Sequence, residues 1–127
     1  MSDTSHVRDG FSAVRPYVYG PLSLAEMVEH AFGARELGRH EVGPNAFHLE
    51  FQIGDSVLVM ELADPPHASG MPGTTYVYVP DVDASHAAAL AAGASEVSAP
   101  EGKPFGERQS GVRDEYGNVW WIATFDH

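Results

Sequence analysis

The chain has 127 residues, and its 18 acidic and 7 basic residues give a formal net charge of −11. A hydrophobic content of 43% is enough for one globular domain with a buried core. The absence of cysteine excludes disulfides, thiolate nucleophiles and cysteine-ligated zinc. The negative charge repels phosphate backbones, so we expect no nucleic-acid partner. The sequence contains neither a long apolar run nor a secretory leader, and we expect a cytoplasmic protein with no membrane partner.

An internal repeat divides the chain into two halves. The segment YVYGPLSLAEMVEHAFGARELG, which starts at Tyr17, reappears as YVYVPDVDASHAAALAAGASEV from Tyr76. Each copy is typical of a strand that a proline ends, followed by a helix that ends near a glycine, Gly33 or Gly93. Further extended runs follow, so the predicted order in each half is β-α-β-β-β.

The fold class predicted from this order is α+β. One helix covers only one face of a four-stranded sheet, so two such units would form a continuous, curved mixed sheet with a cup-shaped site on the uncovered side. We expect a single domain over residues 1–127. Its parts would be repeat 1 at about 12–64, repeat 2 at about 73–126, and a linker rich in Pro and Gly at about 65–72.

The two-fold plan comes with three motifs: the hairpin IGDSVLVMELAD, the strand-turn YVYVPDVDA and the closing GVRDEYGNVWWIAT. Together they resemble the vicinal-oxygen-chelate (glyoxalase/bleomycin-resistance/dioxygenase) superfamily, and within it the PhnB-like branch. The resemblance covers residues 14–124. It implies a cup that binds a divalent metal or a small ligand, and a homodimer.

Metal-using members of the superfamily hold the metal with four inward-facing side chains. The resemblance places these positions at Val14, Glu61, Thr74 and Trp121. One carboxylate is too few, because a catalytic metal site needs about three protein ligands. We therefore expect no cofactor, although a divalent metal at a displaced site stays open.

Three residues are candidate catalytic residues. Strand alternation places His48 and Glu50 on one face of the strand FHLEFQIG, and the neighbouring strand adds Glu61. Carboxylates beside an imidazole fix its tautomer, so this group could transfer protons or form a displaced metal site. The alternative is a polar cross-strand group on a solvated sheet face.

Four residues are candidate ligand-binding residues: Tyr76, Tyr78, Trp121 and Arg108. The aromatic rings would supply flat walls with polar handles, with Trp121 facing the cup and Trp120 in the core. Arg108 lies in the segment GKPFGERQSG, predicted to be a loop at the rim of the cup, where it would bind an anionic ligand or pair with Asp114. Histidines 6, 40, 67, 86 and 127 show no ligand spacing, and we expect them to be solvated.

Three functions are consistent with the sequence, and whether the protein is an enzyme stays open. The first is a glyoxalase/bleomycin-resistance-like protein with a degraded metal site that binds a small, partly aromatic molecule in the cup. The second is a lyase, an isomerase or a metal-dependent enzyme that uses His48, Glu50 and Glu61. The third is a non-catalytic structural homodimer.

Overall fold

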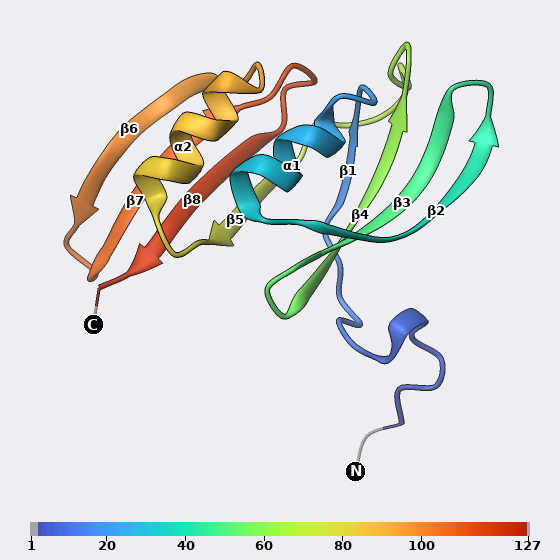
Figure 1. Cartoon of the computed structure of the whole chain (residues 1–127), viewed down its shortest axis with the longest axis horizontal. Coiled ribbons are helices and arrows are strands. Elements are labelled where there is room, and N and C mark those ends of the chain that lie inside the picture. The colour runs from blue at the N-terminus through green and yellow to red at the C-terminus, as the bar shows by residue number, and fades with distance from the viewer. Residues whose placement is uncertain (1–2, 127) are drawn as a thin grey trace.

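Two copies of one β-α-β-β-β unit make up the structure, a computed structural model that describes residues 3–126. The first unit contains β1 (Tyr17–Gly20), α1 (Leu24–Phe32), β2 (Arg35–Gly43), β3 (Ala46–Ile53) and β4 (Ser56–Ala63). The second contains β5 (Thr74–Tyr78), α2 (Val82–Ala91), β6 (Ser95–Lys103), β7 (Glu107–Arg113) and β8 (Val119–Phe125). A short 3-10 helix, Arg8–Gly10, lies in a segment that extends away from the body of the molecule (Figure 1). The predicted fold class is confirmed.

The strands form two separate four-stranded sheets, in the orders β1-β4-β3-β2 and β5-β8-β7-β6. In each sheet the first strand of the unit runs parallel to the last, and the other neighbours are antiparallel. The continuous sheet expected from the sequence is therefore divided, with β1 and β5 each at an edge of its own sheet. The two sheets lie side by side (Figure 1).

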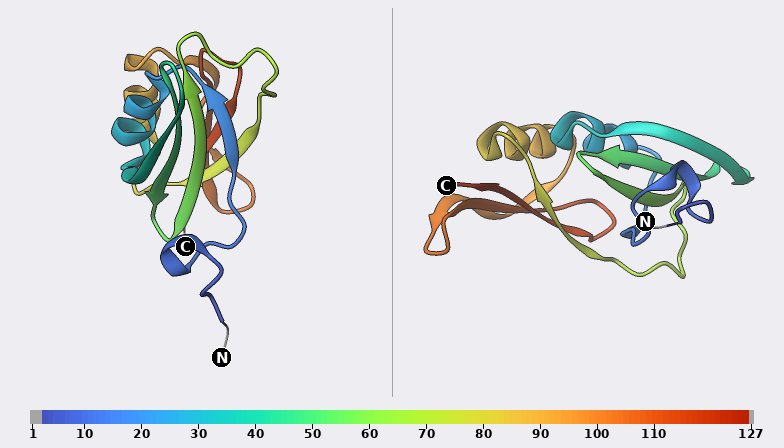
Figure 2. Two further views of the ribbon diagram at one scale, coloured as in Figure 1. Left: turned by 90° about the vertical axis from the view of Figure 1, so that its right-hand side faces the viewer. Right: turned by 90° about the horizontal axis from the view of Figure 1, so that it is seen from below.

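Both helices lie on the same side of the sheets and contact each other (Figure 2). Helix α1 ends at Gly33, whose φ of 68° is a left-handed conformation that suits glycine. Helix α2 begins after Asp81, whose carboxylate accepts a hydrogen bond from the N–H of Ala84 at 3.1 Å. Within the described residues, no helix covers the opposite faces, which we call the open faces. No helix between residues 3 and 126 has the length and apolar character needed to cross a bilayer.

The hydrophobic core lies between the helices and the sheets and is continuous across both units. Val28 of α1, Phe51 of β3 and Ile122 of β8 are fully buried in it. Phe32 of α1 packs against Trp120 of β8 with ring centroids 5.3 Å apart, so the first helix also covers part of the second sheet. Burying a large apolar side chain contributes about 1.5–3 kcal/mol. This shared core therefore holds the two units together.

A buried polar network joins the turn before β8 to the first unit. Asn118, which is 1% exposed, donates a hydrogen bond to the carbonyl oxygen of Tyr19 at 2.8 Å. Its own oxygen accepts from the N–H of Gly73 at 2.8 Å. Asp114 accepts from the Asn118 amide and from the indole N–H of Trp120, both at 2.9 Å. Buried polar groups need such partners, so this network fixes β8 next to β1.

The segment GKPFGERQSG is mostly strand, so its prediction as a rim loop is wrong. Strand β6 continues to Lys103, β7 begins at Glu107, and only residues 104–106 form the turn between them. The glycines and prolines of this region weaken the sequence pattern that predicts strands. Pro100 is tolerated because β6 is an edge strand, where a missing N–H leaves no ladder partner unpaired.

Candidate functional site

A cavity of about 300 Å³ lies between the two sheets, beside the free edge of β5. The β3–β4 hairpin and the segment before β1 form one wall, and β5 forms the other. Its lining residues are Val14, Pro16, Ile53, Gly54, Asp55, Ser56, Val57, Leu58, Thr75, Tyr76, Val77, Tyr78 and Trp120. We call it the inter-sheet cavity. Most of its surface is apolar, with a few hydroxyls and one carboxylate at the rim.

Two of the predicted ligand-binding residues, Tyr76 and Tyr78, line this cavity and lie on the open face of the second sheet. Their rings contact each other with centroids 5.5 Å apart. Both hydroxyls donate hydrogen bonds to the carboxylate of Glu107, reaching over β8 where Ala123 leaves room. The amide of Gln109 donates to the Tyr76 hydroxyl at 3.1 Å.

These hydrogen bonds change the acidity of all three partners. The bonds from Tyr76 and Tyr78 hold the pKa of Glu107 below its ordinary value. Burial and then the Glu107 bond raise the pKa of Tyr76, whereas the Glu107 bond is the main cause of the raised pKa of Tyr78. At neutral pH the group is therefore one carboxylate with two phenols. Sequence reasoning missed Glu107, because its segment was expected to be a loop.

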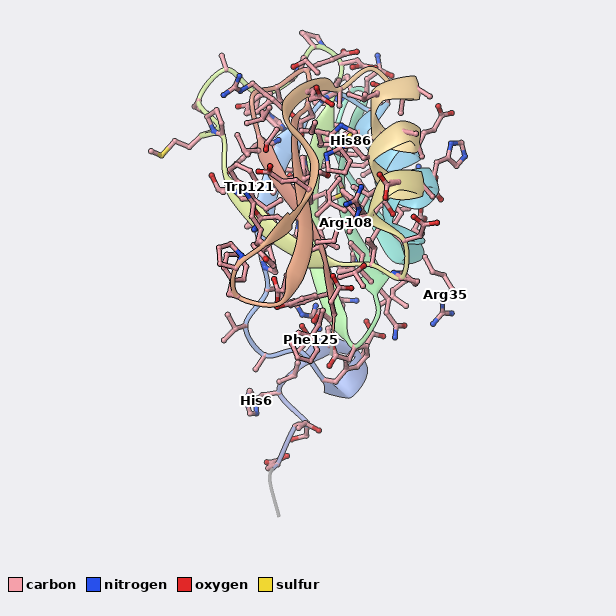
Figure 3. All side chains as sticks on the ribbon, turned by 90° about the vertical axis from the view of Figure 1, so that its left-hand side faces the viewer. His6, Arg35, His86, Arg108, Trp121 and Phe125 are labelled. Atoms are coloured by element: carbon pink, nitrogen blue, oxygen red, sulfur yellow. The ribbon has the colours of Figure 1, made fainter. Side chains whose placement is uncertain are left out.

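Trp120 and Trp121 point to opposite faces of β8, as the strand alternation predicts. Trp120 is fully buried on the helix side. Trp121 lies on the open face, opposite Tyr76 on β5 and Gly111 on β7. In Figure 3 it lies on the side of the sheet away from the helices. Trp121 does not line the inter-sheet cavity, but it extends the aromatic surface that Tyr76 begins.

His48, Glu50 and Glu61 meet on the open face of the first sheet, as the strand pattern predicts. The Nε2 atom of His48 lies 2.6 Å from a carboxylate oxygen of Glu50, and its Nδ1 atom contacts Glu61. Glu50 is only 3% exposed and Glu61 13%, whereas His48 is 31% exposed. The imidazole ring therefore bridges the two carboxylates, one at each ring nitrogen.

Two further residues extend this cluster. Tyr17 of β1 lies beside it, with its ring centroid 6.4 Å from that of His48. Burial, and then the hydrogen bond with Glu61, raise the pKa of Tyr17. His40 of β2 faces His48 with ring centroids 6.1 Å apart, and its Nε2 lies 4.0 Å from Glu50. The cluster thus runs across the whole open face of the first sheet.

The strand registers show how the open faces of the two units correspond. Tyr19, Glu61 and His48 lie opposite one another on β1, β4 and β3. Their counterparts on β5, β8 and β7 are Tyr78, Ala123 and Gln109. By the same registers, the counterpart of Trp121 is Val59. Glu61 and Trp121, which the resemblance places at metal-ligand positions, therefore do not occupy equivalent positions in the two units.

No family model matches the sequence. Uncharacterized protein Mb0911c of Mycobacterium bovis is 33% identical over 113 residues, and the match covers 80% of this chain and 74% of that protein. Uncharacterized protein Rv0887c of Mycobacterium tuberculosis is likewise 33% identical, over 66% of its length. The chain belongs to the family of these mycobacterial proteins.

Solved structures share the fold at lower identity. TioX from Micromonospora sp. ML1 has a TM-score of 0.65 and 23% identity, over 91% of this chain and 98% of that one. A glyoxalase/bleomycin resistance protein/dioxygenase family enzyme from Burkholderia phytofirmans PsJN has a TM-score of 0.64 and 20% identity, over 88% and 95%. Fosfomycin resistance protein FosX from Mesorhizobium loti has a TM-score of 0.61 and 16% identity, over 88% and 90%. The fold is that of the vicinal-oxygen-chelate superfamily, as the sequence resemblance predicted.

A divalent metal at the usual vicinal-oxygen-chelate positions does not fit these residues. Val14 is 91% exposed and precedes β1, and Thr74 is exposed at the start of β5. Glu61 contacts His48, whose other nitrogen contacts Glu50, so the ring separates the two carboxylates. Within the described chain, no three His, Asp or Glu side chains are grouped so that they could share a metal ion.

Arg108 lies apart from the tyrosines, on the helix side of the second sheet. Its guanidinium forms a two-pronged salt bridge with Asp83 of α2, at 2.8 and 2.9 Å. This pairing holds the pKa of Asp83 below its ordinary value. The partner is therefore Asp83 and not Asp114, whose carboxylate is occupied within the network around Asn118. Figure 3 places Arg108 beside α2.

One histidine expected to be solvated is buried. His86 of α2 is 5% exposed, with Nδ1 2.8 Å from the Ser110 hydroxyl and Nε2 2.7 Å from Glu96. The helix turns this side chain toward β6 and β7, which a search for ligand spacing does not detect. His6 and His40 are exposed and His67 is half-buried, while His127 lies outside the described residues.

Proposed function

We propose that the protein binds a small, planar, at least partly aromatic molecule in the inter-sheet cavity. The observation that carries the proposal is the cavity itself, about 300 Å³ in volume, with Tyr76 and Tyr78 in its wall. Small-molecule sites are concave and mostly apolar, with a few polar groups that orient the ligand. Trp121 enlarges the aromatic surface next to Tyr76, where a planar molecule could stack.

The biological role that we propose is to sequester a small toxic molecule or to confer resistance to it. FosX is a fosfomycin resistance protein with the same fold, and the Burkholderia phytofirmans enzyme belongs to a family named after bleomycin resistance. Binding alone would suffice for sequestration, and it requires no metal. From the sequence motifs we also propose that the protein belongs to the PhnB-like branch.

A second copy of the chain would close the cup, and we propose a homodimer. Several large apolar side chains are exposed along the segment before β1, on the open faces and at the end of the second sheet: Val14, Tyr17, Tyr76, Tyr78, Phe105 and Phe125. Burying such a surface between two copies removes apolar area from water. Sedimentation of the purified protein at micromolar concentration should give the mass of two chains.

The cluster on the first sheet supports a second candidate function, proton transfer beside a carbonyl. His48 contacts a carboxylate through each nitrogen, and such a group can accept a proton at one position while it releases one at another. If this candidate is right, the protein will exchange the C3 hydrogens of a 2-oxo acid, which lie next to its carbonyl, for deuterium in heavy water. The His48→Gln variant should not, and exchange that persists in this variant would exclude the candidate.

Calorimetric titration with planar bicyclic compounds such as 2-naphthol tests the first proposal. Ser56 is exposed and lines the cavity, so Ser56→Trp should fill the space without disturbing the core. We expect this variant to bind at least about 10-fold more weakly, since a ligand that loses most of its buried area loses over 1.4 kcal/mol. Ser69→Trp, on an exposed loop outside the cavity, is the matched control. Equal loss in both variants, or no binding by the native protein, would refute the proposal.

A further inference from the structure

The two open faces use the same tyrosine pair next to acidic groups, but they differ in whether a basic side chain contacts the acidic group. In the first unit, Tyr17 and Tyr19 lie beside Glu61, which contacts His48. The imidazole of His48 lies between Glu61 and Glu50, with one carboxylate at each ring nitrogen. The first unit thus forms an aromatic and acidic group around a basic side chain of its own.

The second unit repeats the tyrosines and the acidic group but has an amide, Gln109, where the first has the basic ring. Tyr76 and Tyr78 bond Glu107, while the place of His48 is taken by the neutral Gln109. Among the described residues, no Lys, Arg or His forms an ion pair with Glu107. The Glu107 carboxylate lies next to the two tyrosine rings without a basic partner among the described residues. It therefore has room for a positively charged partner from outside the protein.

The two basic residues closest to Glu107 in the sheet are already engaged. Lys103 is its register partner on β6, but the Lys103 ammonium donates to Glu101 at 2.6 Å. Arg108, the next residue along β7, points to the helix side and binds Asp83. Neither Lys103 nor Arg108 therefore neutralises the Glu107 carboxylate, which accepts hydrogen bonds from the two phenols. Its hydrogen-bonding capacity is not exhausted, because a carboxylate has about four lone-pair sites.

The tyrosine faces are accessible to a ligand. Tyr76 is 42% exposed and Tyr78 59%, and both line the inter-sheet cavity. A cation over an aromatic face within about 6 Å gains about 0.5–2 kcal/mol, more when it is desolvated. The net charge of −11 adds a long-range attraction for positive ligands and disfavours anions.

We propose that the ligand of the inter-sheet cavity carries a positively charged ammonium group, which the rings of Tyr76 and Tyr78 hold next to Glu107. This inference rests on the proposed function and names the chemical class of its ligand. The ammonium group takes the place next to the acidic group in the second unit that the His48 ring has in the first. A planar ring attached to it would extend into the cavity.

A pair of probes with the same shape tests the charge alone. The cation 3-hydroxyphenyltrimethylammonium and the neutral 3-tert-butylphenol differ mainly by one N⁺ in place of a carbon. We expect calorimetry to show at least about 5-fold tighter binding of the cation at low salt. The preference should shrink as sodium chloride is raised toward 1 M, because salt screens the carboxylate. Equal affinity for the two probes, or binding of neither, would overturn the inference.

Three variants locate the effect. Glu107→Gln should abolish the preference, while Glu26→Gln, which removes one exposed charge on α1, should retain it. Tyr78→Phe keeps the ring face and should retain most of the preference. Equal effects of Glu107→Gln and Glu26→Gln would mean that only net charge matters, and would overturn the inference. If Glu107→Gln does not fold, the two probes with the native protein still decide, because equal affinity for both overturns the inference. If Ser56→Trp does not weaken binding more than Ser69→Trp, in contrast, the cavity proposal itself is refuted.

Discussion

Gln109 occupies, in the second unit, the position that His48 occupies in the first. The two residues lie at the same register position on β7 and β3, each two strands away from a tyrosine on the first strand of its unit. The exchange of a basic ring for a neutral amide makes the two open faces chemically different. One face is a self-contained proton network, and the other is a carboxylate held by two phenols.

Replacing His48 by Gln should destabilise the protein by about 2–4 kcal/mol, because a buried carboxylate left without its partner costs this much. Glu50 is only 3% exposed, and it would lose the His48 contact at 2.6 Å. Urea unfolding at pH 7 measures the change. A second substitution, Glu50→Gln, should recover part of the loss because it removes the unpaired charge.

The control for this experiment is His40→Gln. His40 is half-exposed and only 4.0 Å from Glu50, so its removal should change the stability by less than about 0.5 kcal/mol. If His48→Gln were no more destabilising than His40→Gln, the cluster would be a solvated surface group. The proton-transfer candidate would then lose its structural basis.

The phenols that bond Glu107 predict a pH dependence. They lower the pKa of this carboxyl, so the bonds stabilise the folded state above the ordinary pKa of Glu, and this stabilisation is lost as the pH falls through the lowered value. In Tyr76→Phe/Tyr78→Phe, a carbon-13 NMR titration should show the Glu107 pKa rising toward its ordinary value. The stability difference from the native protein should close as the pH falls below the lowered pKa of Glu107.

Tyr116→Phe is the matched control for the Glu107 titration. Its hydroxyl donates to the carbonyl of His67 at 2.8 Å and not to a carboxylate. The Glu107 titration should therefore be unchanged in this variant. A Glu107 pKa that stays low without both phenols would assign the shift to another cause.

His86 should be important for the packing of α2 on the second sheet. His86→Ala removes a buried ring and leaves the hydroxyl of Ser110, which is fully buried, without its partner. The expected loss is about 2–4 kcal/mol, from a cavity and an unsatisfied polar group together. His86→Leu fills the space and should lose less, and adding Ser110→Ala to it should recover stability further. His30→Ala, exposed on α1, should change stability by less than about 0.5 kcal/mol.

Much of the fold could be predicted because the sequence contains an internal repeat. The repeat from Tyr17 and Tyr76 gives the element order, and the positions of Gly33 and Gly93 give the helix ends. The full length of the β6–β7 hairpin could not be predicted, since Pro100 and several glycines suppress the strand signal in this segment. Strand pairing there comes from long-range partners on β8, which a local pattern does not contain.

The candidate site was predictable where strand alternation decides the geometry. His48, Glu50 and Glu61 converge because residues two apart share a face and neighbouring strands align. Glu107 was not predictable, because its role depends on two tyrosines reaching over β8. The same holds for the Arg108 partner, since Asp83 is 25 residues away in sequence and is brought close only by the packing of α2.

Asn118 is a buried polar residue between the two units. Its side chain makes three hydrogen bonds, to Gly73, Tyr19 and Asp114, and joins the two units. Asn118→Ala should cost about 2–4 kcal/mol, because Gly73 N–H and the Tyr19 carbonyl lose their partner. Asn118→Asp should cost more at pH 7, because it places a second carboxylate next to Asp114. Burial and repulsion raise the pKa of such a pair, so lowering the pH should restore stability to Asn118→Asp but not to Asn118→Ala. Thermal unfolding of both variants at pH 5 and 7 separates these outcomes, and equal behaviour at the two pH values would show that residue 118 does not face Asp114.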